Sequence, residues 1–358
     1  PRHPHRPAGR EQGVHGHGSP GKQASSRVAM SAHNMSWIRY PSRVSMAVEE
    51  VIATQSVVSR CTLVYMALFL PLSLAAGLFN LTTFVRGRAR LQGLDACLAD
   101  LTATGLLVTL LSLTAIGRPD YLATTHLGCA VLSLVFNICY FNAQYVQVAM
   151  LSAFLLQRPS CLRAAPQGAQ RPAASLAAIG GCAICSSLGV VALLGMSGEL
   201  YEPTLCQVDP LTAWPEYEIV KVSLGLGLAL VLKLVLLTLL GIRRAGWAAP
   251  PQGDEGSAHC WVVLAVTLAS FACRLLYNTA LVQRARLKLR RDIGAPRDEL
   301  LMNLAELALF GESCAIALAT LLLHRPCRQA LLSLLERLAQ RCRRREAGNN
   351  FSLNRVGS

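Results

Sequence analysis

The chain has 358 residues, of which 53% are hydrophobic and only 15% are charged. Soluble domains usually carry about 25% charged residues, so this composition argues against an ordinary soluble protein and suits a chain that lies in lipid. It also excludes disorder over most of the length. The formal net charge is +14, which in a soluble protein would indicate nucleic acid binding.

Seven apolar stretches are long enough to cross a bilayer as helices, since a span needs about 20 apolar residues. They cover residues 61–85, 96–117, 129–156, 174–196, 219–242, 260–282 and 300–323. The predicted fold class is therefore an all-α membrane protein, a seven-transmembrane helix bundle. We expect the bundle over residues 60–325, after a disordered N-terminal tail at 1–59 and before a C-terminal region at 326–358.

The N-terminal tail is polar and shows no apolar segment of a cleavable signal peptide. Met30 is an alternative start residue. Four of the five histidines of the tail lie within its first 17 residues, and we interpret them as low-complexity sequence rather than as a metal site. They are His3, His5, His15 and His17.

The C-terminal region has leucines at helical spacing among arginines, which predicts a short amphipathic eighth helix on the membrane surface. These leucines are Leu331, Leu334, Leu335 and Leu338. Cys327 and Cys342 flank this segment. Cysteines beside basic residues at a membrane are palmitoylation candidates, with unmodified thiols as the alternative.

The positions of the basic residues predict how the chain is oriented. With the N-terminus outside and the C-terminus cytoplasmic, most arginines outside the spans face inward, and the basic loop 284–297 is the exception. Inward-facing arginines bind anionic lipid headgroups, so nucleic acid is not needed to explain the charge. The sequon at Asn34 then lies outside and is a candidate glycosylation site of a multi-pass plasma membrane protein.

Three features together resemble a known receptor family. Cys129 opens the third stretch and Cys206 lies between the fourth and fifth, both on the outer side, where disulfides persist. Residues 99–101 read Ala-Asp-Leu within the second stretch. With the seven spans, this pattern resembles a rhodopsin-like (class A) G-protein-coupled receptor over residues 61–340. The resemblance implies a Cys129–Cys206 disulfide.

The resemblance also implies partners and an ion site. An Asp within a membrane span is costly and functional by default. In that family it lies in a sodium and water site that couples to activation, which here comprises Asp100, Asn80 and Ser313, and a helix-packing contact is the alternative. The partners implied are an extracellular ligand of unknown identity, a heterotrimeric G protein and a second receptor copy in a dimer.

Other motifs of the family are replaced. Residues 153–155 read Ala-Phe-Leu in place of Asp-Arg-Tyr, Arg274 stands at the Trp position of span six, and Glu312 at the Asn position of span seven. The last two positions touch in the family, so we predict an Arg274–Glu312 ion pair in place of an aromatic switch. Pairing of Arg274 with Glu306 or with water is the alternative. The missing motifs imply other G-protein contacts, high basal activity or no coupling.

Polar residues of the third stretch share one helix face, which we expect to point into the bundle. They are Asn137, Tyr140, Gln144 and Gln147. We assign the first two to a ligand pocket, together with Tyr277 and Glu306, and the other two to helix packing. Phe136 replaces the Asp that amine receptors of this family use, so an amine anchored in that way is not expected.

No motif of an enzyme occurs in the sequence, and neither an enzymatic activity nor a metal site is expected. The predicted function is that of a membrane receptor. A non-signalling, receptor-shaped partner protein is the first alternative, because the activation motifs are missing. A small-solute transporter is the second, although no internal repeat supports it.

Overall fold

A computed structural model describes residues 42–87, 93–117, 124–156, 172–194, 203–204, 209, 213–245, 254–291 and 294–356. By their contacts, Pro1–Met46 and Ala47–Ser358 form two separate units, and the features below belong to the second, apart from the first five residues of α1. Asn34, Cys206 and the candidate start Met30 lie outside the described residues.

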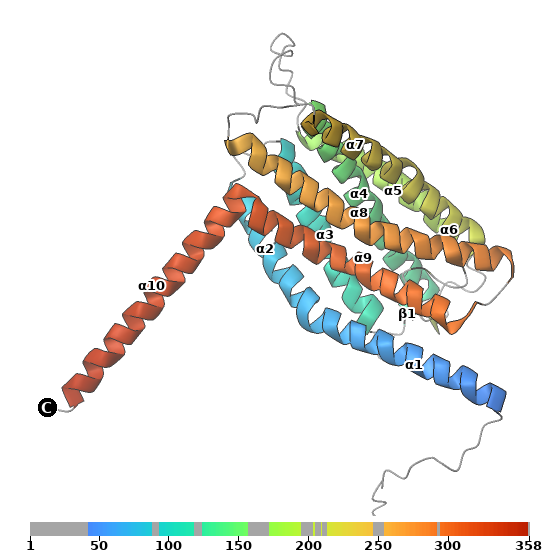
Figure 1. Ribbon diagram of the computed structural model, residues 1–358, viewed down its shortest axis with the longest axis horizontal. Coiled ribbons are helices and arrows are strands. Elements are labelled where there is room, and N and C mark those ends of the chain that lie inside the picture. Colours follow the sequence, from blue (N-terminus) through green and yellow to red (C-terminus); the bar gives the residue numbers. More distant parts are fainter. Residues whose placement is uncertain are drawn as a thin grey trace, which may run out of the picture. The chain divides into compact units, whose positions relative to one another are not determined.

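The described part of the chain is almost entirely helical (Figure 1). The helices are α1 (Ser42–Val64), η1 (Tyr65–Phe69), α2 (Leu70–Arg86), α3 (Gly93–Gly117), α4 (His126–Leu156), α5 (Pro172–Val191), α6 (Pro215–Val222), η3 (Ser223–Leu230), α7 (Val231–Ala245), α8 (Asp254–Leu289), α9 (Pro296–Leu323) and α10 (Arg325–Val356). Two short strands, β1 (Thr124–Thr125) and β2 (Pro203–Thr204), pair antiparallel. We call the end of the bundle where α4 begins and α8 ends the strand end, and the end where α9 meets α10 the tail end.

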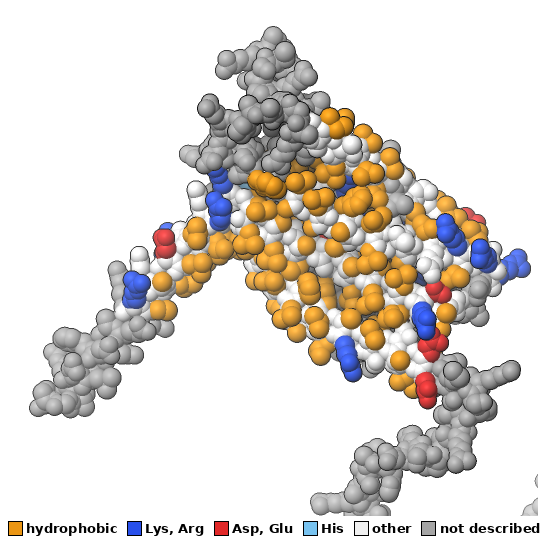
Figure 2. Space-filling view, viewed as in Figure 1, with side chains coloured by type: hydrophobic (Ala, Val, Ile, Leu, Met, Phe, Trp, Pro, Cys, Tyr) orange, Lys and Arg blue, Asp and Glu red, His pale blue; other side chains and the backbone are white. Residues whose placement is uncertain are grey.

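Six helical segments are long and apolar enough to cross a membrane. They are Glu49–Arg86, Gly93–Thr114, His126–Ala153, Ala173–Val191, Trp261–Leu289 and Pro296–Leu323. Hydrophobic side chains cover much of the bundle face seen in Figure 2, and most Lys and Arg side chains there lie near its ends. Such a large exposed apolar surface is expected of a protein solvated by lipid. The structure thus supports a helical membrane-spanning protein.

The predicted fifth span is not among these six. Residues 219–242 fall in the consecutive elements α6, η3 and α7, which are helical throughout. Val231, Leu234 and Val235 are exposed on this segment, whereas its two lysines, Lys221 and Lys233, are completely buried. An apolar outer face with buried charges is the pattern of a helix at the lipid boundary of a bundle.

The first helix begins at Ser42, within the region 1–59 that was expected to be a disordered tail. The hydrogen-bond pattern of this helical segment changes at η1. There Leu70 N–H donates to Tyr65 O, five residues earlier in the chain, whereas in an α-helix the acceptor is four residues earlier. Pro71 follows directly and has no N–H to donate, which explains a local widening of the helix at this point.

The helix that follows α9 is longer than the amphipathic helix predicted there. Helix α10 has 32 residues and is not the short helix that we expected. Leu332, Leu334, Leu335 and Leu338 are exposed on it, which agrees with an apolar face directed toward a membrane surface.

Two buried clusters form the core of the bundle. The cluster toward the strand end is rich in aromatic side chains, among them Phe136, Tyr277 and Phe310. The cluster toward the tail end is mainly aliphatic and includes Met150 and Ile316. Buried polar side chains lie at the boundary between these clusters, and they form the candidate site.

Candidate functional site

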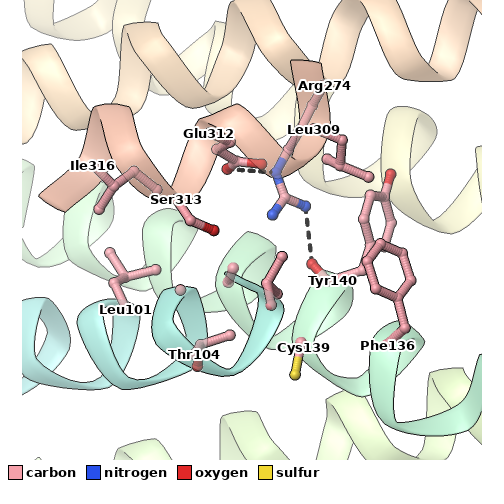
Figure 3. A pocket seen from close by; sticks show the side chains of 13 residues that line it. Leu101, Thr104, Phe136, Cys139, Tyr140, Arg274, Leu309, Glu312, Ser313 and Ile316 are labelled. Carbon is pink, nitrogen blue, oxygen red and sulfur yellow. Dashed lines mark hydrogen bonds and ion pairs between the residues drawn. The ribbon is translucent and has the colours of Figure 1, made fainter. Parts of the chain in front are cut away.

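An ion pair joins α8 and α9 in the middle of the bundle. Arg274 Nε lies 2.8 Å from Glu312 Oε1, and neither side chain is more than 5% exposed. Figure 3 shows the two side chains pointing toward each other from neighbouring helices. Ser270 Oγ donates to the same carboxylate at 2.5 Å, and Arg274 Nη1 donates to the backbone oxygen of Tyr140 at 2.9 Å. The structure therefore brings together the two residues that the sequence predicted to pair.

A second buried cation lies next to this pair. Lys233 of α7 donates to Gln144 Oε1 at 2.5 Å and to Gln147 Oε1. Gln147 Nε2 in turn donates to Glu312 Oε1 at 3.4 Å, so this amide links Lys233 to the ion pair. The two glutamines that the sequence assigned to helix packing thus accept hydrogen bonds from the buried Lys233 ammonium. Amide oxygens are suited to this because a buried ammonium is costly without hydrogen-bond acceptors.

A second ion pair lies toward the strand end. Lys221 Nζ of α6 is 2.6 Å from Asp209 Oδ1, and both side chains are fully buried. Tyr217 and Tyr277 donate their hydroxyl hydrogens to the same carboxylate, Tyr217 at 2.7 Å. Burial by itself raises the pKa of the Asp209 carboxyl, but the Lys221 ammonium and the two hydroxyls outweigh it and hold that pKa below its usual value.

Tyr140 and Asn278 connect the two ion pairs. The Tyr140 hydroxyl donates to Asn278 Oδ1 at 3.1 Å, and Asn278 Nδ2 donates to the backbone oxygen of Arg274 at 2.7 Å. The rings of Tyr140 and Tyr277 lie 5.8 Å apart. A chain of buried polar groups therefore extends from a loop residue at the strand end into the bundle. This polar column consists of Asp209, Lys221, Tyr277, Tyr140, Asn278, Arg274, Glu312, Gln147 and Lys233.

The column packs closely against η3. Gly225→Ala is expected to lower the free energy of unfolding by about 1–3 kcal/mol, because the added Cβ would overlap the Tyr140 hydroxyl and lie 3.1 Å from Tyr140 Cε1. Gly227→Ala is the matched control, since its Cβ would meet no atom within 4 Å. Thermal unfolding of both variants in detergent measures the difference. Equal midpoints for the two variants would contradict this packing.

The residues of the predicted ligand pocket lie in two places. Three of its residues come together at the strand end, where Asn137 Nδ2 donates to the Tyr217 hydroxyl at 3.4 Å beside Tyr140 and Tyr277. Glu306 is half-buried on α9, six residues before Glu312. The cavity next to the ion pair has a volume of about 20 Å³, which is room for about one water molecule. The residues around it include Thr104, Gly105 and Ser313 (Figure 3).

The predicted sodium site has a different set of contacts from the expected one. Asn142 Nδ2 donates to Asp100 Oδ2 at 2.7 Å and to Thr104 Oγ1 at 3.1 Å. Asn80 instead donates to the backbone oxygen of Ala317 at 2.8 Å. Because Asn142 presents N–H groups to the oxygens that a cation would need, this arrangement fits a hydrogen-bonded carboxylate better than a bound sodium ion. Ser313 is buried next to Gly105, on the same side of α9 as Glu312 (Figure 3).

The two candidate palmitoylation sites differ in accessibility. Cys342 is exposed on α10, whereas Cys327 is completely buried and lies 3.4 Å from His324 Nδ1. Burial, and secondarily Asp95, raises the pKa of the Cys327 thiol to about 12. The structure therefore counts against Cys327 as an acylation site, because the reacting species is an accessible thiolate.

In native membranes treated with neutral hydroxylamine to cleave any thioester, N-ethylmaleimide is expected to label Cys342 and to spare Cys327, because only the first thiol is exposed. Mass spectrometry of the α10 peptides measures the labelled fraction of each cysteine. Cys342→Ser should likewise remove any palmitate from this segment, and Cys327→Ser should leave it in place. Equal labelling of both thiols in the folded protein would show that this part of α10 is not packed as described.

The strand pairing bears on the predicted disulfide. Thr204, two residues before Cys206, lies opposite Thr124, five residues before Cys129. Cys129 is buried in the first turns of α4. The pairing therefore brings Thr204 close to the start of α4, which is compatible with a Cys129–Cys206 bond. That bond stays a prediction.

No protein-family model matches the chain, and no curated protein matches it. The polar column is the feature of the described residues that bears most directly on function.

Proposed function

We propose that the chain is a receptor in the plasma membrane that takes up an extracellular signal at the strand end and signals to heterotrimeric G proteins at the tail end. The observation that supports this is the polar column. It begins at a loop residue, Asp209, and reaches Glu312 and Lys233 through hydrogen bonds and packed rings. A change at the loop therefore has a physical route to the contacts between α7, α8 and α9.

The proposed membrane arrangement has seven spans. The segment Pro215–Ala245 is the fifth, in addition to the six long apolar helices. The N-terminus with the Asn34 sequon is outside, the Cys129–Cys206 bond ties α4 to the second outer loop, and α10 lies along the inner membrane surface. This is the arrangement of a rhodopsin-like receptor, and a receptor dimer remains compatible with it.

The proposed switch is electrostatic. Residues 153–155 lack the Arg that holds the inactive state in the receptor family, while Arg274 and Glu312 are paired across α8 and α9. A buried ion pair is strong only while its geometry is good, so a small displacement of α8 against α9 shifts the balance between two arrangements of the bundle. In this proposal the Arg274–Glu312 pair takes the role of the Trp side chain in span six of rhodopsin-like receptors.

Nucleotide exchange on a panel of purified G proteins tests the proposal in membranes that contain the full chain. We expect basal exchange above that of empty membranes for at least one G protein. Gln147→Leu should change this rate several-fold, because it cuts the link between Lys233 and Glu312 without adding a buried charge. Exchange equal to empty membranes for every G protein, at good surface expression, would contradict signalling and favour a receptor-shaped partner protein.

Transport is a second candidate, and the buried charges favour it. Lys233, Arg274 and Glu312 form a polar path in an apolar bundle, and such groups also mark ion and proton pathways. Ion or solute flux into liposomes that contain the chain separates this function from signalling. The closely filled core, with room for about one water molecule beside the ion pair, is the reason that we rank transport second.

A further inference from the structure

The ammonium group of Lys221 lies within a box of aromatic rings. Four ring centroids are 5.4–5.6 Å from Lys221 Nζ, within the range of about 6 Å over which a cation is attracted to a ring face. The rings belong to Phe136, Tyr140, Tyr217 and Tyr277. They come from three helices, α4, α6 and α8, so the box depends on the tertiary fold.

Asp209 completes this box with a full negative charge. Its carboxylate is 2.6 Å from Lys221 Nζ, and the hydroxyls of Tyr217 and Tyr277 donate to it. Both side chains are fully buried. Aromatic faces around one carboxylate are the features by which proteins recognise an alkylammonium group. All of them are present here, and a side chain of the same chain occupies the centre.

We propose that these four rings and Asp209 form a binding site for a primary alkylammonium group, and that Lys221 is its permanent occupant. An amine anchored by a carboxylate at position 136 is not expected from the sequence, because Phe136 stands there. In the structure Phe136 is instead one wall of the box, and the carboxylate comes from the loop before α6. This inference goes beyond the proposed receptor function, since it concerns binding and is measured without signalling.

The site makes a specific chemical prediction. Lys221→Ala removes Cγ, Cδ, Cε and Nζ, which are together the heavy atoms of n-propylammonium. The variant leaves the carboxylate buried without its cation, which should lower the thermal midpoint by roughly 10 °C. n-Propylammonium at about 10 mM, a concentration suited to so small a ligand, should restore at least half of that loss. It should leave the midpoint of the unaltered chain unchanged, because Lys221 fills the site.

The experiment is thermal unfolding of the full chain, solubilised and heated in the presence of n-propylammonium chloride, with 1-propanol and sodium chloride as matched additives. Lys221→Met is the control variant, because it removes the charge but leaves no space, and it should be destabilised without rescue. Adding Asp209→Asn to Lys221→Ala should abolish the rescue.

Restoration by n-propylammonium alone supports the site. No restoration, equal restoration by 1-propanol, or equal rescue of Lys221→Met would overturn it. Where Lys221→Ala fails to accumulate, the amine in the growth medium should raise its surface level relative to Lys221→Met. Equal levels of the two variants would then overturn the proposal.

Discussion

Glu312→Gln is expected to lower the free energy of unfolding by about 3–5 kcal/mol, because it leaves the Arg274 guanidinium buried without a counter-ion. Arg274 would keep its bond to the backbone oxygen of Tyr140, but that neutral acceptor does not balance a full charge. Thermal unfolding in detergent and surface expression in cells both measure the effect. Few single substitutions elsewhere in the bundle should cost as much.

Glu299→Gln is the matched control for this substitution. Glu299 is an exposed residue on the same helix, and the change removes the same charge in the same chemical way. It should leave the free energy of unfolding within about 0.5 kcal/mol of the unaltered chain. If both variants unfold at the same temperature, the buried pair does not hold α8 against α9.

Asp209→Asn is the second substitution with a large expected effect. It leaves the Lys221 ammonium buried among aromatic rings without a counter-ion, and the free energy of unfolding should again fall by about 3–5 kcal/mol. Glu216→Gln, an exposed acidic residue in the first turn of α6, is the matched control and should have little effect. Thermal unfolding of the two variants measures the difference, and similar losses for both would contradict a buried Asp209–Lys221 pair.

The pKa of Asp209 sets the pH range of this contribution. Its folded-state pKa lies below the usual value, so the stabilisation is fully present above the unfolded-state pKa and is lost as the pH falls through the lower, folded-state pKa. The gap in midpoint between the unaltered chain and Asp209→Asn should therefore be the same at pH 7 and pH 5.5. A gap that shrinks over this range would mean that Asp209 is protonated near neutral pH in the folded protein.

The helices and one buried contact could be predicted from the sequence. Length and apolarity determine a membrane-crossing helix, and six of the seven predicted spans are long apolar helices in the structure. The Arg274–Glu312 contact was predicted because two substitutions fall together at positions that touch in a resembling family. A charged residue within a membrane span needs a partner, so two opposite charges at positions that touch in the family strongly predict an ion pair.

The contacts of Asp209 and Asp100 could not be predicted in the same way. Asp209 lies in a loop, and the spacing of residues says nothing about how deeply a loop enters a bundle. Lys221 is an ionisable residue near the start of the fifth predicted stretch, and that position alone does not identify its partner. Asp100 has Asn142 as its amide partner instead of Asn80. This could not be predicted, because helix periodicity places polar residues on one face of a helix without specifying which faces of two helices meet.

The ends of the chain also differ from the prediction. Helix α1 extends into the region expected to be disordered, and α10 is longer than expected. The polar composition of these two segments makes a packed structure less expected, but a polar segment can still form a helix without burying an apolar face. The burial of Cys327 depends on how α10 begins against α9, which the spacing of the cysteines does not reveal.

The most direct test of the account is a charge-reversal cycle on the pair at the centre of the polar column. Arg274→Glu and Glu312→Arg are each expected to abolish surface expression, because each buries two like charges side by side. The double variant restores opposite charges across the same contact and should recover at least half of the surface level, although Ser270 and Gln147 then face a changed partner. A double variant that reaches the surface no better than the weaker single variant would contradict a direct Arg274–Glu312 pair.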